Sequence, residues 1–478
     1  MRILKIIKSG HMTHRRAFAG MNRLLLFTFP FFLSLIWLGC SDFINVDPPK
    51  NNLISVTVFK DPATVESAMA NLYYSMREQG MTSGSFGLTP VLSIYGDELD
   101  YYGFNADQTQ LYNHNHSADN NVLWGWWQQA YYLIYGANDI IRGVESSNDL
   151  SVDEKKAFHG QALFVRGYVH SLLVSLFGDV PYVNSTNYRE NNTVARMAEE
   201  KVYDSIIRDL TDAVELLEGI EPISKRRIWP DRYVAKALLA RMYLYTENWE
   251  MATSTASELI DHFPLETNLS NTFLKGSPET IWQLAADENF PNNTREAGTL
   301  IIQTVPGQTY ALTDALLASF ENGDLRYDNW IGNVSDSNNT TTLYYPHKYK
   351  AGVNEKESLE YSILFRSAEQ VLIRSEARAH MGNLTGSQTD LNSIRNRAGL
   401  SNTTVTTAHG LLEAIQRERR VELFAEQGHR WFDLKRTANA GRALTDLKPN
   451  WQETDILLPI PEAELEINPN LLPQNPGY

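Results

Sequence analysis

The chain has 478 residues and a formal net charge of −15, with 42 basic and 57 acidic side chains. A chain this acidic is not expected to bind nucleic acid, or to dock on anionic lipid through its charge. Hydrophobic residues make up 43% and charged residues 21%, which is typical of a globular protein, and the single cysteine excludes a disulfide framework and a cysteine-based metal cluster.

The N-terminus has the order of features that marks a secretory signal. Asn22 and Arg23 precede an apolar run over 24–38, which is shorter than the roughly 20 residues that span a bilayer. A transmembrane anchor is the alternative. Because Met21 directly precedes this segment, we expect residues 1–20 to be an upstream extension and residues 21–39 to be the signal peptide.

The segment Ile36-Trp37-Leu38-Gly39-Cys40 resembles the lipobox of bacterial lipoproteins. In such proteins the cysteine after the box is lipidated and becomes the mature N-terminus, so the resemblance implies lipidation at Cys40. Several acyl chains on one residue give stable anchoring, because each buried CH₂ contributes about 0.8 kcal/mol. Residues 40–56, which are rich in Pro and Asn, are then a tether between the lipid and the folded body.

The region 57–264 is predicted to be helical. Asp61 and Pro62 have the chemistry of an N-cap and a first helical position. Ser151 and Glu154 are spaced as a capping box that opens a helix running to Phe177. Two further helices are predicted, one over 202–217 and one from a buried stripe at helical spacing formed by Trp127, Tyr131, Ile134 and Asn138.

Residues 233–264 fit the tetratricopeptide pattern of two packed helices. Small residues such as Ala240, Ala252 and Ala256 let the helices approach, although Lys236 stands where a large apolar residue is usual. The fold class is therefore predicted to be mainly α, built from tetratricopeptide-like helical hairpins. Weaker pairs of the same kind are 154–177 with 199–217, and 366–381 with 387–398.

The composition changes between about 265 and 365, where Asn, Thr, Gly and Pro are frequent and short β-like runs occur at 280–284 and 343–345. This pattern predicts a loop-rich insertion with short β segments, carried on the helical frame. Helices are predicted to resume at Phe365 and to run to Gln427, with Gly428 ending the last of them. The tail over 456–478 is predicted to be extended.

Four stretches, in chain order and together with the lipobox-like segment, resemble the SusD/RagB family of outer-membrane nutrient-binding lipoproteins. They are the Trp127/Tyr131/Ile134/Asn138 stripe, Arg166–Pro181, Arg417–Arg436 and Leu458–Tyr478.

The resemblance implies a SusD-like α/α fold with an N-terminal region over 57–264 and a C-terminal region over 265–478. It also implies a lipid-anchored protein on the exterior of an outer membrane. Such a protein binds an oligosaccharide or polysaccharide without cleaving it and delivers it to a SusC-like TonB-dependent transporter, although other members bind peptides. The charged residues within 417–436 are expected to form structural ion pairs and caps rather than an active site.

The sequence contains no strong catalytic motif, and no cofactor, metal or nucleic acid is expected. His114 and His116 offer two imidazoles without an obvious third ligand, so they are interpreted as surface histidines. Asp97, Glu98 and Asp100 are the candidate acids for a glycoside hydrolase, which is an alternative that we do not favour. The same acidic segment lacks the spacing of a calcium loop.

A non-catalytic sugar site needs exposed aromatic faces that stack on pyranose rings, with polar groups around them that pair with hydroxyls. The segment 95–126 fits this description, and the insertion offers a second set of aromatic residues. Ordinary packing is the alternative for each residue, and a scaffold for protein partners is the alternative for the whole chain. The predicted ligand-binding residues are Tyr95, Asp97, Tyr101, Tyr102, Phe104, Asn105, Trp124, Trp126, Tyr310 and Trp330.

Overall fold

The computed structural model describes residues 56–286, 293–352 and 355–478. The predicted upstream extension, signal peptide, lipidation site Cys40 and nearly all of the tether lie outside these residues. The described part is mainly helical with short strands, which confirms the predicted fold class. Within the described ranges, no helix is both long and apolar enough to cross a bilayer.

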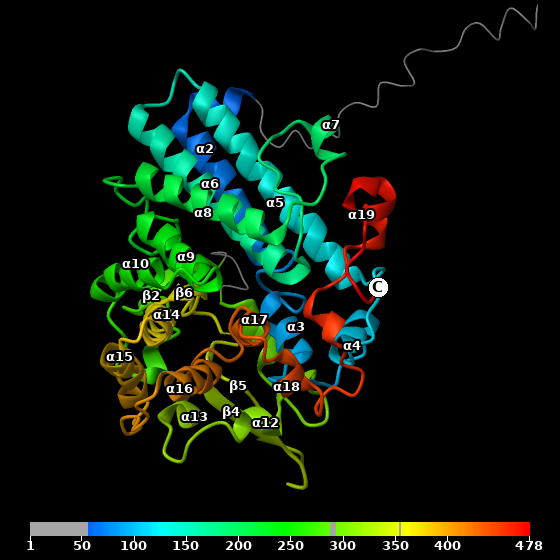
Figure 1. The fold of residues 1–478 in the computed structure, drawn as a ribbon, viewed down its shortest axis with the longest axis vertical. Coiled ribbons are helices and arrows are strands. Elements are labelled where there is room, and N and C mark those ends of the chain that lie inside the picture. Colours follow the sequence, from blue (N-terminus) through cyan, green and yellow to red (C-terminus); the bar gives the residue numbers. More distant parts are fainter. Residues whose placement is uncertain (1–55, 287–292, 353–354) are drawn as a thin grey trace, which may run out of the picture. The chain divides into compact units, whose positions relative to one another are not determined.

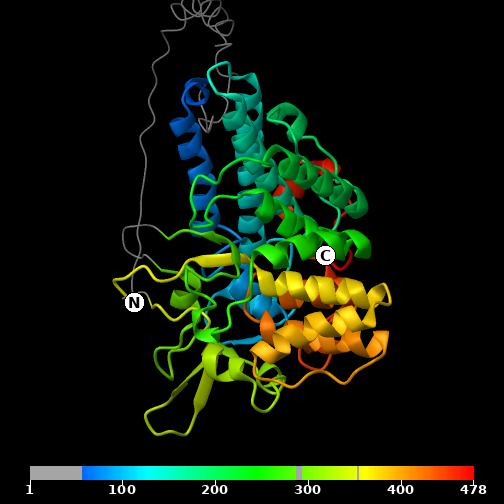
Figure 2. The ribbon, with the colours of Figure 1, turned by 90° about the vertical axis from the view of Figure 1, so that its left-hand side faces the viewer.

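Four helices of the N-terminal region pack against one another (Figures 1 and 2). The predicted caps are present, because the Asp61 carboxylate accepts from the backbone N–H of Ala63, and Ser151 and Glu154 form a capping box. The Trp127 stripe lies on one of these helices and its members are buried or half-buried, which confirms that it belongs to the core. The four helices are α2 (Pro62–Glu78), α5 (Asn121–Ser146), α6 (Val152–Phe177) and α8 (Glu199–Leu216).

The tetratricopeptide-like pair continues into a second group of helices (Figure 2). The Lys236 ammonium reaches Glu258 on the facing helix, which explains why a charged residue is tolerated where the pattern favours an apolar one. Arg241 pairs with buried Glu369, and the rings of Trp249 and His380 stack at 3.9 Å. The helices are α9 (Arg232–Tyr245), α10 (Trp249–His262), α14 (Ser367–His380), α15 (Leu384–Arg397) and α16 (Ala408–Glu422).

Within the described ranges, three two-stranded antiparallel sheets lie among these helices: β1 with β3, β2 with β6, and β4 with β5. Five of the six strands belong to the predicted insertion, and the runs at 280–284 and 343–345 are strands as predicted. The sixth, β1, precedes it and joins the insertion to the N-terminal region. The strands are β1 (Leu99–Tyr101), β2 (Thr280–Leu284), β3 (Tyr310–Leu312), β4 (Ile331–Ser335), β5 (Thr342–Pro346) and β6 (Ser362–Arg366).

The prediction of helix up to Gln427 with Gly428 as its stop is wrong. α16 ends at Glu422, and Gly428 is the residue before α17 (His429–Arg436). Its φ of +72° is left-handed, and a Cβ at this position would lie 2.3 Å from Leu92 Cδ1. Glycine is therefore required here by both conformation and space. Glu426, in the turn between α16 and α17, is buried.

A buried ion-pair network joins the insertion and the end of β6 to α15 and α16. Its centre is Glu422, whose carboxylate accepts from Arg326, Arg366 and Arg397. Burial opposes the ionisation of Glu422, but the three guanidinium groups more than offset it and hold its pKa well below the usual range. The expectation that charged residues within 417–436 form ion pairs is thereby confirmed. The other members are Glu279, Asp324, Lys348, Glu418 and Glu426.

The C-terminal tail packs across α6, but it is not extended throughout as predicted. Asn475 Nδ2 donates to the backbone oxygens of Phe177 and Leu458, at 2.8 and 2.7 Å. The remaining short elements are α3 (Leu88–Tyr95), α4 (Ala106–Tyr112), α7 (Tyr188–Asn191), α11 (Arg295–Leu300), α12 (Asp314–Leu317), α13 (Leu325–Trp330), α18 (Ala440–Leu444), α19 (Glu462–Ile467) and 3₁₀ turns at Val56–Lys60, Leu269–Asn271, Glu453–Ile456 and Pro469–Leu471.

Candidate functional site

A groove of about 840 Å³, which we call the aromatic groove, opens where the β1–β3 sheet meets the loop before α3. Its lining includes Tyr101, Tyr102, Phe104, Asn105 and Tyr310, which are five of the ten residues predicted from the sequence. The structure therefore brings together residues of the 95–126 segment and one residue of the insertion.

The pairing of β1 with β3 builds the back of this groove. Tyr101 lies opposite Tyr310 in the antiparallel register, and their ring centroids are 5.6 Å apart. The Tyr310 hydroxyl accepts from Gln108 Nε2 at 2.8 Å, and the Tyr101 hydroxyl accepts from the backbone N–H of Asn105 at 3.0 Å. The Asn105 side chain caps α4. These side chains are held in place, so they form a fixed wall.

Three aromatic rings stand free at the front of the groove. The exposed fractions are 41% for Tyr102, 102% for Phe104 and 45% for Phe86. Phe86 is not among the residues predicted from the sequence. Its position between Gly84 and Gly87 is typical of an exposed loop, and this pattern could have identified it. Exposed aromatic rings in a concave surface are unusual unless they bind something, so these rings are the part of the groove suited to sugar stacking.

Three of the predicted residues belong to the core instead. Tyr95, Trp126 and Trp330 are at most 1% exposed, so none has a face that a sugar can reach. The polar atom of each ring is satisfied internally: Tyr95 Oη donates to the backbone oxygen of Asp455, Trp126 Nε1 to that of Phe86, and Trp330 Nε1 to that of Leu269. The Trp126 bond still serves the groove, because it anchors the loop that carries Phe86.

Trp124 is exposed, but it does not line the aromatic groove. It lies on α5, two residues from Trp126 and thus on another side of that helix, and its side chain is near the Glu464 carboxylate of α19. From the sequence, Trp124 is predicted to lie in the same ligand-binding loop as Tyr102. Because α5 already begins at Asn121, the two residues point to different surfaces.

The acidic candidates are buried or tied to other groups. Asp97 is 3% exposed and pairs with Arg420 and Arg430. Burial alone would raise its pKa, but the two arginines hold it below the usual value. Asp97 is therefore a structural anchor for the 417–436 motif and not a ligand contact. Asp100 accepts a hydrogen bond from the Tyr112 hydroxyl at 2.9 Å.

Glu98 has the raised pKa expected of a catalytic acid, but it lacks access to substrate. Burial raises its pKa from 4.5 to about 7. One carboxylate oxygen accepts from Ser93 and from the backbone N–H of Ala425, and the other has no hydrogen-bond partner among the described residues. Glu98 is 1% exposed and lies outside the groove lining. Its raised pKa is therefore explained mainly by burial, with a smaller contribution from the charge of Asp97.

Substitution of Glu98 by glutamine is expected to remove the loss of folding stability that this buried carboxyl group causes as the pH rises. The folded-state pKa lies above the unfolded value, so the contribution of Glu98 is fully present below pH 4.5 and is lost as pH rises through about 7. Glutamine does not titrate. The unfolding free energy of E98Q relative to the original chain should therefore rise by on the order of 3 kcal/mol between pH 4.5 and 8, as measured by urea unfolding. E466Q, at an exposed site, is the control. A difference in unfolding free energy between E98Q and the original chain that does not change with pH would contradict the raised pKa of Glu98.

The interpretation of His114 and His116 as surface histidines is wrong. Both are buried: the His114 ring nitrogens contact Asp455 and the backbone oxygen of Tyr95, and His116 Nε2 lies 2.6 Å from the Tyr478 hydroxyl. The pair thus packs the C-terminal residue against α3. Among the described residues, no three His, Cys, Asp or Glu side chains gather as metal ligands would.

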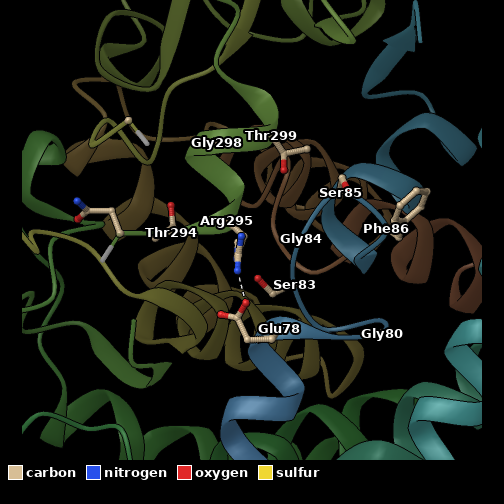
Figure 3. Close-up of a pocket in the computed structure, with 12 residues that line it drawn as sticks. Glu78, Gly80, Ser83, Gly84, Ser85, Phe86, Thr294, Arg295, Gly298 and Thr299 are labelled. Atoms are coloured by element: carbon tan, nitrogen blue, oxygen red, sulfur yellow. Dashed lines mark hydrogen bonds and ion pairs between the residues drawn. The ribbon is translucent and has the colours of Figure 1, made fainter. Parts of the chain in front are cut away.

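A second groove of about 350 Å³, which we call the arginine groove, adjoins the first (Figure 3). The two grooves share Ser85, Phe86, Gly298 and Thr299 in their linings. The arginine groove is lined by Glu78, from the end of α2, and Arg295, from the start of α11, which are joined by an ion pair (Figure 3). No local sequence pattern predicts this pair, because 217 positions separate its members.

Solved structures share this fold. A SusD superfamily protein from Bacteroides vulgatus superposes with a TM-score of 0.75 at 21% identity, covering 88% of this chain and 100% of that one. A laminarin-binding SusD-like protein gives 0.74 at 22% identity, covering 88% and 100%. Surface glycan-binding protein A of Bacteroides thetaiotaomicron, in complex with laminarihexaose, gives 0.73 at 17% identity, covering 86% and 99%.

Sequence comparisons agree with the fold. SusD-like protein P2 of Formosa agariphila is 28% identical over 93% of this chain and 98% of its own length. A SusD-like protein of Bacteroides ovatus is 24% identical over 58% of this chain and 49% of its own length. One family model, described as "Starch-binding associating with outer membrane", matches residues 42–244, and another, described as "SusD family", matches residues 291–478. The chain belongs to the SusD/RagB family.

Proposed function

We propose that the chain is a surface lipoprotein that binds an oligosaccharide or polysaccharide in the aromatic groove without cleaving it. The observation that carries this proposal is the set of three exposed rings, Phe86, Tyr102 and Phe104, around one concave surface. Flat rings stack on the C–H faces of sugars, and the polar side chains of Asn105, Gln308 and Thr309 are available to pair with sugar hydroxyls.

Binding without hydrolysis is supported by the composition of the groove. None of the described residues that line the aromatic groove is an acid, whereas glycoside hydrolysis needs two carboxyl groups roughly 5–10 Å apart across the bond. Two of the fold relatives are described as binding laminarin or laminarihexaose, which supports a glycan as the ligand class.

The proposed location and partner are supported by the family and by the N-terminal sequence. Lipidation at Cys40 would hold the protein on an outer membrane, facing outward, and the family model's description includes association with an outer membrane. A TonB-dependent, SusC-like transporter is the proposed acceptor of the bound glycan.

An affinity screen of residues 41–478 against polysaccharides and peptides tests this function. We expect binding to at least one polysaccharide, and the chain length of a bound oligosaccharide should be unchanged after prolonged incubation. Shortening of the oligosaccharide would establish a hydrolase instead. Binding to peptides alone would favour the peptide-binding members of the family.

A further inference from the structure

The arginine groove continues the aromatic groove past Phe86. The residues that line both grooves are Ser85, Phe86, Gly298 and Thr299. The Phe86 ring is 45% exposed at this junction (Figure 3). The backbone of the junction is held at two points, because Trp126 Nε1 donates to the Phe86 oxygen at 2.6 Å and Gln108 Nε2 donates to the Ser85 oxygen at 2.7 Å. The two grooves therefore keep a fixed relation to each other.

The arginine groove differs in chemistry from the aromatic groove. Among the described residues that line it, Phe86 is the only aromatic one, and the others are polar residues or glycines. The glycines leave space in it, because a Cβ at Gly84 or Gly352 would meet no atom beyond its neighbours in the chain within 4 Å. An open, polar hollow of this kind suits a sugar ring that is held through its hydroxyl groups and not by stacking.

Glu78 and Arg295 place an acceptor and a donor side by side in this groove. Arg295 donates to the Glu78 carboxylate, and 13% of the Glu78 side chain and 41% of the Arg295 side chain remain exposed (Figure 3). A sugar hydroxyl both donates and accepts, so neighbouring hydroxyls pair with the carboxylate and the guanidinium at once. The ion pair orients both groups before the sugar arrives, which lowers the entropy that binding costs.

Two further acidic residues stand beside this groove and argue against an anion as its occupant. The Glu355 backbone N–H donates to the Gly352 oxygen at 3.1 Å. The Glu357 backbone oxygen accepts from Asn293 Nδ2 at 2.7 Å. Gly352 and Asn293 both line the groove. With carboxylates and a guanidinium around one hollow, hydroxyl groups are the better match, because they pair with either.

We infer that the arginine groove is a second subsite for the same glycan chain. Sugars stacked on the three rings of the aromatic groove continue past Phe86, and the hydroxyls of the next sugars pair with Glu78 and Arg295. The ligand class is therefore a polysaccharide, or an oligosaccharide longer than the three rings hold, and not a mono- or disaccharide. This inference rests on the proposed function and adds the length of chain that the site recognises.

Fragments of different length test the inference by calorimetry on the full chain. The probes are a size-fractionated trisaccharide and a size-fractionated hexasaccharide, both cut from the polysaccharide that the affinity screen identifies. The trisaccharide offers one sugar to each exposed ring, whereas the hexasaccharide also reaches into the arginine groove. We expect the hexasaccharide to bind about ten-fold tighter than the trisaccharide.

The variant G352W fills the arginine groove alone. Gly352 lines that groove and not the aromatic one, its φ lies outside the left-handed region and its Cβ position is open, so the backbone accepts an indole side chain. In G352W the hexasaccharide should bind within about two-fold of the trisaccharide, which still binds. G276W is the matched control, because Gly276 has the same open Cβ position and lines neither groove, and it should keep the full preference.

The variant R295A tests the ion pair without adding bulk. Loss of the guanidinium should reduce the preference for the hexasaccharide by about three-fold or more. R142A is the control, because Arg142 is also an exposed arginine paired with a carboxylate, on α5, and it should keep the full preference. Should G352W melt well below G276W, R295A decides alone.

Equal affinity for the trisaccharide and the hexasaccharide would overturn the inference and leave glycan binding intact. An unchanged preference for the hexasaccharide in a folded G352W or in R295A would do the same. If no polysaccharide binds in the affinity screen, the proposed function itself fails, and the inference fails with it.

Discussion

Replacement of Glu422 by alanine is expected to lower the free energy of unfolding by about 3–5 kcal/mol. Glu422 is fully buried, and its Oε1 accepts from Arg366 Nη1 at 2.6 Å and from Arg397, while its Oε2 accepts from Arg326 Nη1 at 3.0 Å. Removal of this carboxylate leaves three guanidinium groups desolvated and short of an acceptor. The remaining carboxylates of the network are already engaged, so they offset only part of the loss.

Urea unfolding followed by circular dichroism measures this effect. E218A is the control, because Glu218 pairs with Arg232 at the surface with 59% of its side chain exposed, and such pairs contribute at most about 1 kcal/mol. A loss for E422A no larger than that for E218A would mean that the buried network does not hold the insertion to the helical frame.

The helices could be predicted because capping residues and hydrophobic spacing are patterns of neighbouring residues. Asp61, Ser151 with Glu154, and the spacing of the Trp127 stripe each specify a helix end or a buried face within a few residues, and the structure has them as expected. The turn at Gly428 was misread for the same reason. Glycine after a helical pattern usually marks the end of a helix, whereas here the deciding fact is the distant side chain of Leu92.

The site was half predictable. Aromatic residues in a polar segment indicate a binding loop, and two rings of this segment, Tyr102 and Phe104, are exposed in the aromatic groove. Aromatic composition cannot distinguish an exposed ring from a buried one, so it also selects Trp126 and Trp330. In the structure both rings are buried in the core, and each donates its Nε1–H to a backbone oxygen. The partnership of Tyr101 with Tyr310 depends on a strand pairing between distant segments, which no local pattern encodes.

Substitution of both Tyr102 and Phe104 by alanine is expected to weaken glycan binding by about 100-fold or more. Both rings project from the wall formed by Tyr101 and Tyr310, so their removal takes away stacking area without disturbing that wall. The backbone bond from Tyr102 N–H to the Thr309 oxygen, at 2.8 Å, does not depend on the side chain. Stability should therefore change by no more than about 0.5 kcal/mol, as for other exposed positions.

Trp124 provides the matched control for this experiment, because its exposed fraction of 38% is close to the 41% of Tyr102 while its ring contacts α19 instead of the groove. W124A should bind the polysaccharide identified by the screen within about two-fold of the original chain. The comparison therefore tests whether the ligand needs the rings of the aromatic groove, beside the β1–β3 sheet, or binds to an exposed aromatic residue elsewhere. If W124A lost affinity and the double variant kept it, the ligand would lie on the surface between α5 and α19, and the aromatic groove would not be the binding site.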